Sequence, residues 1–182
     1  MTTVNAATEN PQYLTFRMLG ETYALGILRV REIIEYSRVT RVPRMPAFVR
    51  GVINLRGHVV PVLDLATKFG LETVAVTQDT CIVILEVAAD DEKQIIGIVT
   101  DAVDEVIDLA PERIEPPPTF GTRIDTRFIV GMGVMEASFL LIIDIEQILS
   151  DDDLAAVTLA AEGTEEAHEI PPEILATTSP IP

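Results

Sequence analysis

The feature that most constrains the fold of this chain is a frame of residues that occurs twice. In each copy a glycine stands thirteen residues before an aspartate, and two apolar runs separated by a polar turn lie between them. The copies begin at Gly51 and Gly131 and end at Asp64 and Asp144. Apolar runs joined by a polar turn are typical of a β-hairpin, and Gly57 suits a turn position with positive φ. The repeat therefore predicts two equivalent hairpins, each followed by a short helix that its aspartate caps.

The segments around the two hairpins repeat in the same order. Each half reads as strand, turn, strand, bulged strand, proline-containing connection, hairpin and short helix; residues 12–68 form the first half and residues 69–150 the second. Five short strands that must hide their edges favour a small barrel. We therefore expect an all-β protein of two five-stranded barrels, preceded by a flexible N-terminus over residues 1–11.

The last part of the chain, residues 151–182, differs in composition from the rest. It contains eight acidic residues and no lysine or arginine, and few of its side chains are bulky. Ordering a residue costs roughly 1–2 kcal/mol of backbone entropy, and this composition offers little apolar surface to offset that cost. We expect an acidic tail that is partly helical or disordered and that is dispensable for folding.

Charge is unevenly distributed in this chain, whose net charge is −16. Residues 11–68 contain nine basic and four acidic residues, whereas residues 69–149 contain four basic and sixteen acidic residues. A surface that tracks nucleic-acid phosphates needs a basic patch, so nucleic acid is a poor partner for the whole molecule. The asymmetry is explained either by ordinary solvated faces or by a basic face that docks on an acidic protein surface.

The cysteine content and the N-terminus indicate the cellular compartment. Cys81 is the single cysteine, which excludes a disulfide framework and indicates a reducing compartment. The start of the chain has neither the basic nor the apolar region of a signal peptide, and no apolar run is as long as a membrane span. We expect a cytoplasmic protein that does not insert into the membrane.

The motifs that carry catalysis are missing from the sequence. No histidine, cysteine and acidic residues have metal-ligand spacing, no nucleophile has a suitable base, and no glycine-rich phosphate loop is present. Asp64 and Asp144 could form a pair of catalytic carboxylates, but helix capping accounts better for their matching positions. Cys81 lies within an apolar strand, which favours an inert core thiol. The sequence therefore favours binding over catalysis, with no metal and no cofactor.

Three residues stand out as candidates for binding a partner. Arg56 lies at the tip of the first hairpin, where the second hairpin carries the opposite charge at Glu136. Glu32 lies in an apolar strand, where burial without a partner would be unfavourable. Phe120 lies in a loop between prolines and a glycine, where a large aromatic side chain either tucks under the loop or meets a partner.

Several short motifs in this order resemble those of the CheW family of chemotaxis adaptors. The resemblance covers residues 12–149 and is strongest in residues 13–17, 23–27, 30–33, 46–51, 54–57 and 61–65. It implies two intertwined five-stranded SH3-like barrels with no active site. It also implies an adaptor that links transmembrane chemoreceptors to the histidine kinase CheA in arrays at the inner membrane.

The resemblance assigns roles to the candidate residues. It implies that receptor tips dock near Val30, Glu32 and Arg56, and that the regulatory domain of CheA, itself CheW-like, meets the adaptor barrel to barrel. Phe120 matches a kinase or array-ring contact of the family, and other copies of the adaptor are further partners. The acidic tail and Glu115 depart from the family pattern. Two alternatives stay open: an adaptor of a sister pathway for pili or gene expression, and a small enzyme that uses Asp64 and Asp144.

Overall fold

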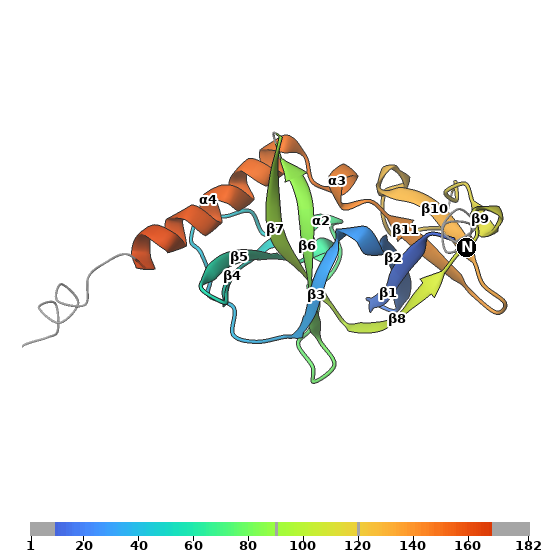
Figure 1. Ribbon diagram of the computed structural model, residues 1–182, viewed down its shortest axis with the longest axis horizontal. Helices are drawn as coiled ribbons and strands as arrows, with labels where there is room; N and C mark the ends of the chain where they lie inside the picture. The colour runs from blue at the N-terminus through green and yellow to red at the C-terminus, as the bar shows by residue number, and fades with distance from the viewer. Residues whose placement is uncertain (1–9, 90, 120, 169–182) are drawn as a thin grey trace, which may run out of the picture.

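The chain folds into two mixed β-sheets with a few short helices and one longer helix (Figure 1). The computed structural model describes residues 10–168 except residues 90 and 120. The first sheet has the spatial order β8 (Ala102–Asp108), β1 (Gln12–Met18), β2 (Glu21–Gly26), β11 (Phe139–Ile143), β10 (Ile129–Val134) and β9 (Ile114–Glu115). The second sheet has the order β3 (Val30–Glu35), β6 (Cys81–Ala89), β7 (Glu92–Thr100), β5 (His58–Leu63) and β4 (Val49–Leu55).

The helices lie where the repeated frame predicts them, with one addition. Asp64 caps α2 (Leu65–Lys68) by accepting a hydrogen bond from the backbone N–H of Thr67 at 3.2 Å. Asp144 caps α3 (Ile145–Ile148) by accepting from the N–H of Glu146 at 2.9 Å. The addition is α4 (Asp151–His168), and single 3₁₀ turns are η1 (Ile27–Arg29), η2 (Pro111–Arg113) and η3 (Thr126–Phe128). No helix in the described ranges is long and apolar enough to cross a membrane.

The two hairpins of the repeated frame occupy equivalent positions in different sheets. Gly51 lies opposite Val62, and Gly131 lies opposite Ile142, so the register of both hairpins is the same. The second strand of each hairpin also has the same kind of neighbour, because β5 pairs in parallel with β7 and β11 pairs in parallel with β2. The prediction of two equivalent hairpins in separate sheets is therefore confirmed.

The prediction of closed barrels is wrong, because no pairing among the described strands joins the two ends of either sheet. The sheets also do not follow the expected division between residues 12–68 and 69–150. Strand β3 pairs with β6 of the later half, and β8 pairs with β1 of the earlier half. Between β7 and β8 stands a single residue, Asp101, which is too few for the chain to fold back beside β7. The chain therefore continues into the other sheet.

The glycine of the repeated frame lets another segment cross the hairpin closely. Thr40 forms two backbone hydrogen bonds with Val52 at 2.8 Å, and a Cβ atom on Gly51 would stand 2.1 Å from the carbonyl oxygen of Thr40. Gly51 also has a φ of +145°, which favours glycine. In the second copy, a Cβ atom on Gly131 would stand 2.7 Å from a side-chain methyl group of Ile114. Both glycines therefore allow a proline-containing connection to pack against its hairpin.

Cys81 lies at the start of β6 rather than in the middle of a buried strand. Its side chain is half-buried, and the thiol donates a hydrogen bond to the carbonyl oxygen of Asp79 at 3.4 Å. Burial raises the pKa of the Cys81 thiol, which disfavours the reactive thiolate. The position expected for this cysteine was thus wrong, although its environment still suppresses reactivity.

Helix α4 forms a helical part of the acidic tail, and it packs on the second sheet. It lies against β4 and β5, and it buries three side chains on one face, those of Leu154, Val157 and Ala160. Ser150 and Asp153 cap its first turn reciprocally at 3.0 and 3.1 Å. The packing stripe needs only three apolar side chains at helical spacing, so it forms although the segment has few bulky residues. Residues 169–182 of the expected tail lie outside the described residues.

Two polar contacts fix α4 on the second sheet. The ammonium group of Lys68 at the end of α2 lies 2.6 Å from the carboxylate of Asp153. The hydroxyl of Thr158 donates to the side-chain oxygen of Gln94 on β7 at 3.1 Å. Burial opposes ionisation of Asp153, but hydrogen bonds from Lys68 and Ser150 outweigh it, so the pKa of Asp153 lies below its usual value. The start of the helix is therefore held by a charge pair.

Replacing Gly51 with alanine should lower the free energy of unfolding by roughly 2–4 kcal/mol, because it combines a strained φ with a clash against Thr40. Chemical denaturation measures this loss. Gly70→Ala is the control, because Gly70 has a φ of +80° and open space around it. Equal losses in the two variants would show that the close approach of Thr40 is unimportant.

Truncation after Ser150 should destabilise the protein by roughly 2–5 kcal/mol, because it removes the buried stripe of α4. Urea unfolding measures the change. Leu154→Ala should account for a large part of it, whereas Leu159→Ala on the exposed face of the same helix should have little effect. A truncated protein as stable as the full chain would contradict the packing of α4.

Acidification should weaken the attachment of α4. The pKa of Asp153 is lower in the folded protein, so its stabilising contribution is present above the unfolded value of about 3.9 and disappears as pH falls through the folded value. The difference in melting temperature between the protein and its Asp153→Asn variant should therefore shrink across that pH range. A difference that stays constant on acidification would disprove the role of this charge.

Candidate functional site

The tip of the first hairpin places Arg56 in an unusual backbone conformation. Leu55 pairs with His58, so Arg56 and Gly57 form a two-residue turn, with φ values of +52° and +85°. Positive φ at both positions is the pattern of a type I′ turn, whose first position is usually asparagine, aspartate or glycine. A long side chain held in this conformation is disfavoured, and such positions cluster at functional sites.

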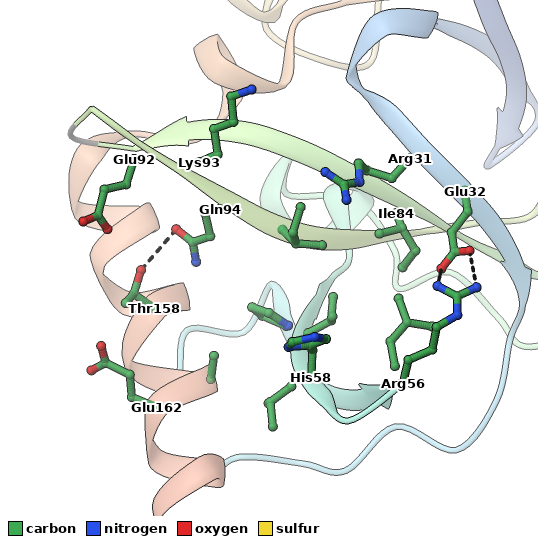
Figure 2. Close-up of a pocket in the computed structure, with 16 residues that line it drawn as sticks. Arg31, Glu32, Arg56, His58, Ile84, Glu92, Lys93, Gln94, Thr158 and Glu162 are labelled. Atoms are coloured by element: carbon green, nitrogen blue, oxygen red, sulfur yellow. Dashed lines mark hydrogen bonds and ion pairs between the residues drawn. The ribbon is translucent and has the colours of Figure 1, made fainter.

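Arg56 and Glu32 form a bidentate ion pair across the surface (Figure 2). The two guanidinium NH₂ groups of Arg56 donate to the two carboxylate oxygens of Glu32 at 2.8 and 2.7 Å. The Arg56 side chain is 73% exposed and the Glu32 side chain 26% exposed. The structure thus brings together two residues that the sequence identified separately.

The ion pair favours the charged form of both side chains. Its hydrogen bonds hold the pKa of Glu32 below its usual value and raise the pKa of Arg56 further. Arg56 therefore strengthens the preference of Glu32 for its charged form. The pair uses two of the five N–H donors of the guanidinium group, which leaves three on an exposed side chain.

The apolar residues beside the ion pair differ in exposure. Val30 is half-buried, packs on the core and pairs with Leu85 of β6. The register shifts between Val30 and Glu32, which confirms the bulge expected in this strand. Leu28, in the adjacent turn η1, is 96% exposed. Leu28 was not among the candidate residues, although an apolar residue in a segment with neither helical nor strand periodicity can indicate a binding surface.

A groove of about 790 Å³ extends from the ion pair to helix α4. Its walls come from β3, β5, β7 and α4, and Figure 2 shows the side chains that face it. Both charged and apolar side chains line the groove, including those of Arg31, Lys93, Glu162, Ile84 and Val60. Such a surface fits an amphipathic partner better than a small reactive molecule. The groove was not predicted from the sequence, because α4, which forms one wall, belongs to a tail that was expected to be partly helical or disordered and dispensable for folding.

Glu86 forms ion pairs with two basic side chains that line this groove. Its carboxylate lies 3.0 Å from the ammonium group of Lys93 and also accepts a hydrogen bond from Arg31. Hydrogen bonds from Lys93 and then Arg31 hold the pKa of Glu86 below its usual value. The three side chains come from β6, β7 and β3, so the positive charges on the groove are held in place by three adjacent strands.

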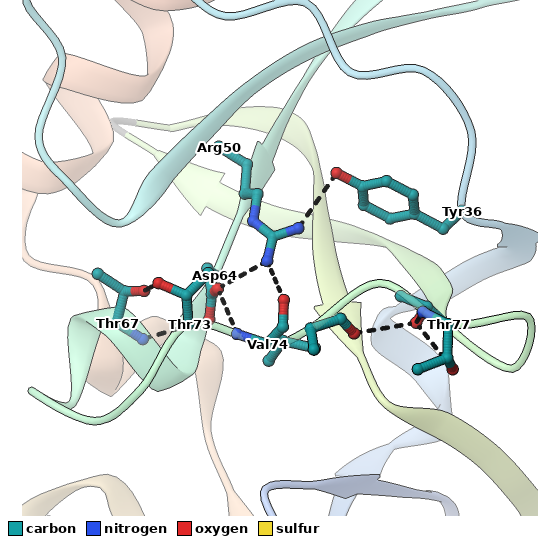
Figure 3. A network of polar contacts seen from close by, with 9 residues as sticks. Tyr36, Arg50, Asp64, Thr67, Thr73, Val74 and Thr77 are labelled. Carbon is teal, nitrogen blue, oxygen red and sulfur yellow. Dashed lines mark hydrogen bonds and ion pairs between the residues drawn. The ribbon is translucent and has the colours of Figure 1, made fainter.

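The carboxylate of Asp64 is fully engaged in a buried network (Figure 3). It accepts hydrogen bonds from the N–H groups of Thr67 and Val74, and Arg50 lies 3.3 Å away. Arg50 in turn donates to the hydroxyl of Tyr36 at 3.1 Å and to the carbonyl oxygen of Val74. Asp64 is only 1% exposed, so no substrate can reach it.

The positions of Asp64 and Asp144 disfavour the alternative of an enzyme that uses them as paired carboxylates. Asp64 follows β5 of the second sheet and Asp144 follows β11 of the first, and each caps the helix after its own hairpin. Across the described ranges, no three or more histidine, cysteine and acidic side chains are grouped to hold a metal ion.

Phe120 lies outside the described residues, so its contact stays a prediction.

Comparisons with known proteins agree with this architecture. Residues 12–153 match the CheW-like domain. The chain is 36% identical over 155 residues to the chemotaxis protein CheW of Klebsiella aerogenes, which covers 85% of this chain and 91% of that protein. It is 33% identical over 150 residues to the chemotaxis protein CheW of Treponema pallidum, covering 80% and 86%.

A solved structure shows the same fold. The crystal structure of the scaffolding protein TtCheW from Thermoanaerobacter tengcongensis superposes with a TM-score of 0.69 at 33% sequence identity, covering 79% of this chain and 90% of that one. The matches in sequence and in structure each extend over most of both partners. The chain therefore belongs to the CheW-like family of chemotaxis adaptors.

Proposed function

We propose that the protein couples the cytoplasmic tips of chemoreceptors to the regulatory domain of the histidine kinase CheA. In this proposal the receptor docks on the Glu32–Arg56 pair, on Val30 and on the adjoining groove. The observation that carries it is the bidentate ion pair on a strained turn at the rim of the groove. The protein acts by binding and catalyses no reaction.

The exposed pair is better explained by a partner than by folding. Exposed ion pairs contribute little to stability, so they do not offset the strain of an arginine at the Arg56 position. Arginine with free donors is enriched among residues that dominate interfaces, and Leu28 and Val30 supply apolar contact beside it. Glu32 holds the guanidinium group in one orientation before the partner arrives, which reduces the entropy lost on binding.

CheA and neighbouring adaptors dock on other surfaces in this proposal. The loop that contains Phe120 provides a kinase or array-ring contact, as the family resemblance implies. The adaptor then works at receptor arrays beside the inner membrane, where one surface holds the receptor and another holds the kinase.

Reversing either charge of the pair should separate the two binding activities. Arg56→Glu and Glu32→Lys should each weaken binding to a receptor cytoplasmic fragment by about tenfold or more, because a charge-assisted contact becomes a repulsion. Calorimetric titration should show a much smaller change for the CheA regulatory domain. Arg127→Glu is the matched control, because Arg127 is a similarly exposed arginine that forms an ion pair with Asp125 elsewhere.

A double variant distinguishes a partner contact from a structural one. Glu32→Arg combined with Arg56→Glu restores an ion pair within the chain but presents reversed charges to the receptor. Receptor affinity should stay low in this variant. Recovery of receptor affinity would make the pair merely structural, and equal losses for both partners would indicate misfolding. Unchanged receptor affinity in the single variants would leave Arg56 as an ordinary solvated turn residue.

A further inference from the structure

A second charged surface lies in the connection between β3 and β4, away from the Glu32–Arg56 pair. This segment, residues 38–47, is called the arginine loop here, and it presents the exposed side chains of Arg38, Arg41 and Arg44. From residue 36 to residue 63 the sequence contains no acidic residue. The loop is therefore a basic surface in a protein whose net charge is −16.

The arginines of this loop have no partners within the described part of the chain. Eight of the thirteen lysine and arginine side chains form ion pairs there, and none of the eight belongs to the loop. To the residues that the structure describes, Arg38, Arg41 and Arg44 also make no side-chain hydrogen bond. Their positive charges remain available to a ligand.

The loop surrounds a hollow of about 410 Å³ that is separate from the groove beside α4. Arg41 and Arg44 line it together with apolar side chains, those of Pro43, Met45 and Val49. The backbone around the hollow is fixed, because Thr40 is hydrogen-bonded to Val52 and the side chain of Phe48 is buried. A ligand that binds here meets a preorganised surface, so little loop entropy is lost.

The backbone conformation of Arg44 indicates that its side chain has a binding role. Arg44 has a φ of +63° and follows Pro43, which is the arrangement of a type II turn. Glycine or asparagine is the usual residue at that position, because a larger side chain is strained there. Within the described residues Arg44 makes no hydrogen bond or ion pair that would offset this strain, so a contact outside the chain accounts for it better.

We infer that the arginine loop binds a short acidic segment of a partner protein, with Arg41 and Arg44 pairing with its carboxylates. Guanidinium groups recognise carboxylates through paired hydrogen bonds, and the apolar side chains of the hollow accept apolar neighbours of those carboxylates. An extended polyanion such as nucleic acid, or an anionic bilayer, would also meet the acidic remainder of the molecule, which repels it. This surface is independent of the proposed receptor contact.

The test is a titration of the ¹⁵N-labelled full chain with a short synthetic peptide in which glutamate alternates with leucine. Amide shift changes should saturate and cluster in residues 38–49, and they should weaken as ionic strength rises. A variant with Arg41→Gln and Arg44→Asn should bind the peptide about fivefold or more weakly. Its melting temperature should not fall, because asparagine tolerates the left-handed conformation.

Controls decide whether the loop itself is responsible. Arg113→Gln removes another exposed arginine without an ion pair and should leave the affinity for the peptide unchanged. A peptide with glutamine in place of glutamate should not bind. The inference is overturned if shifts fall elsewhere, if the double variant binds normally or if the glutamine peptide binds equally. Tighter binding of anionic vesicles or of DNA, or self-association that the double variant abolishes, would also overturn it.

Discussion

Both sides of the groove depend on the contacts that the buried carboxylate of Asp64 makes with Arg50 and with the start of α2. It caps α2, and α2 carries Lys68, whose ammonium group holds the start of α4. Its partner Arg50 reaches Tyr36, which directly follows β3, the strand that carries Glu32. A buried carboxylate without its cationic partner is strongly unfavourable, so Arg50 and Asp64 act as one unit. The wall formed by α4 and the wall formed by β3 therefore have a common anchor.

The repeated frame was enough to predict the local structure around each hairpin. Gly51 and Gly131 mark the close crossings, and Asp64 and Asp144 cap the helices. These features depend on neighbours that are near in sequence, so spacing alone determines them. The exchange of β3 and β8 between sheets does not follow from spacing, because the residue pattern of a strand does not specify which neighbour it pairs with.

The single residues of the candidate site could be predicted from the sequence, but their pairing and the groove beside them could not. Arg56 was recognisable from its turn and Glu32 from its apolar surroundings, yet their pairing depends on the bulge in β3 and on the twist of a two-residue turn. The groove depends on α4, whose acidic composition concealed a narrow apolar stripe. Arg44 was missed because its backbone conformation, rather than its residue type, distinguishes it.

The exchange of strands between the sheets has a consequence for how the protein is made. When residues 12–68 have left the ribosome, β3 still lacks β6, its pairing partner, and β1 still lacks β8. Each edge stays open until the later half is synthesised, which exposes it to chaperones or to wrong pairing. Once both exchanges are complete, each sheet contains strands from both halves of the chain. The nascent chain therefore can complete neither sheet before its later half has been synthesised.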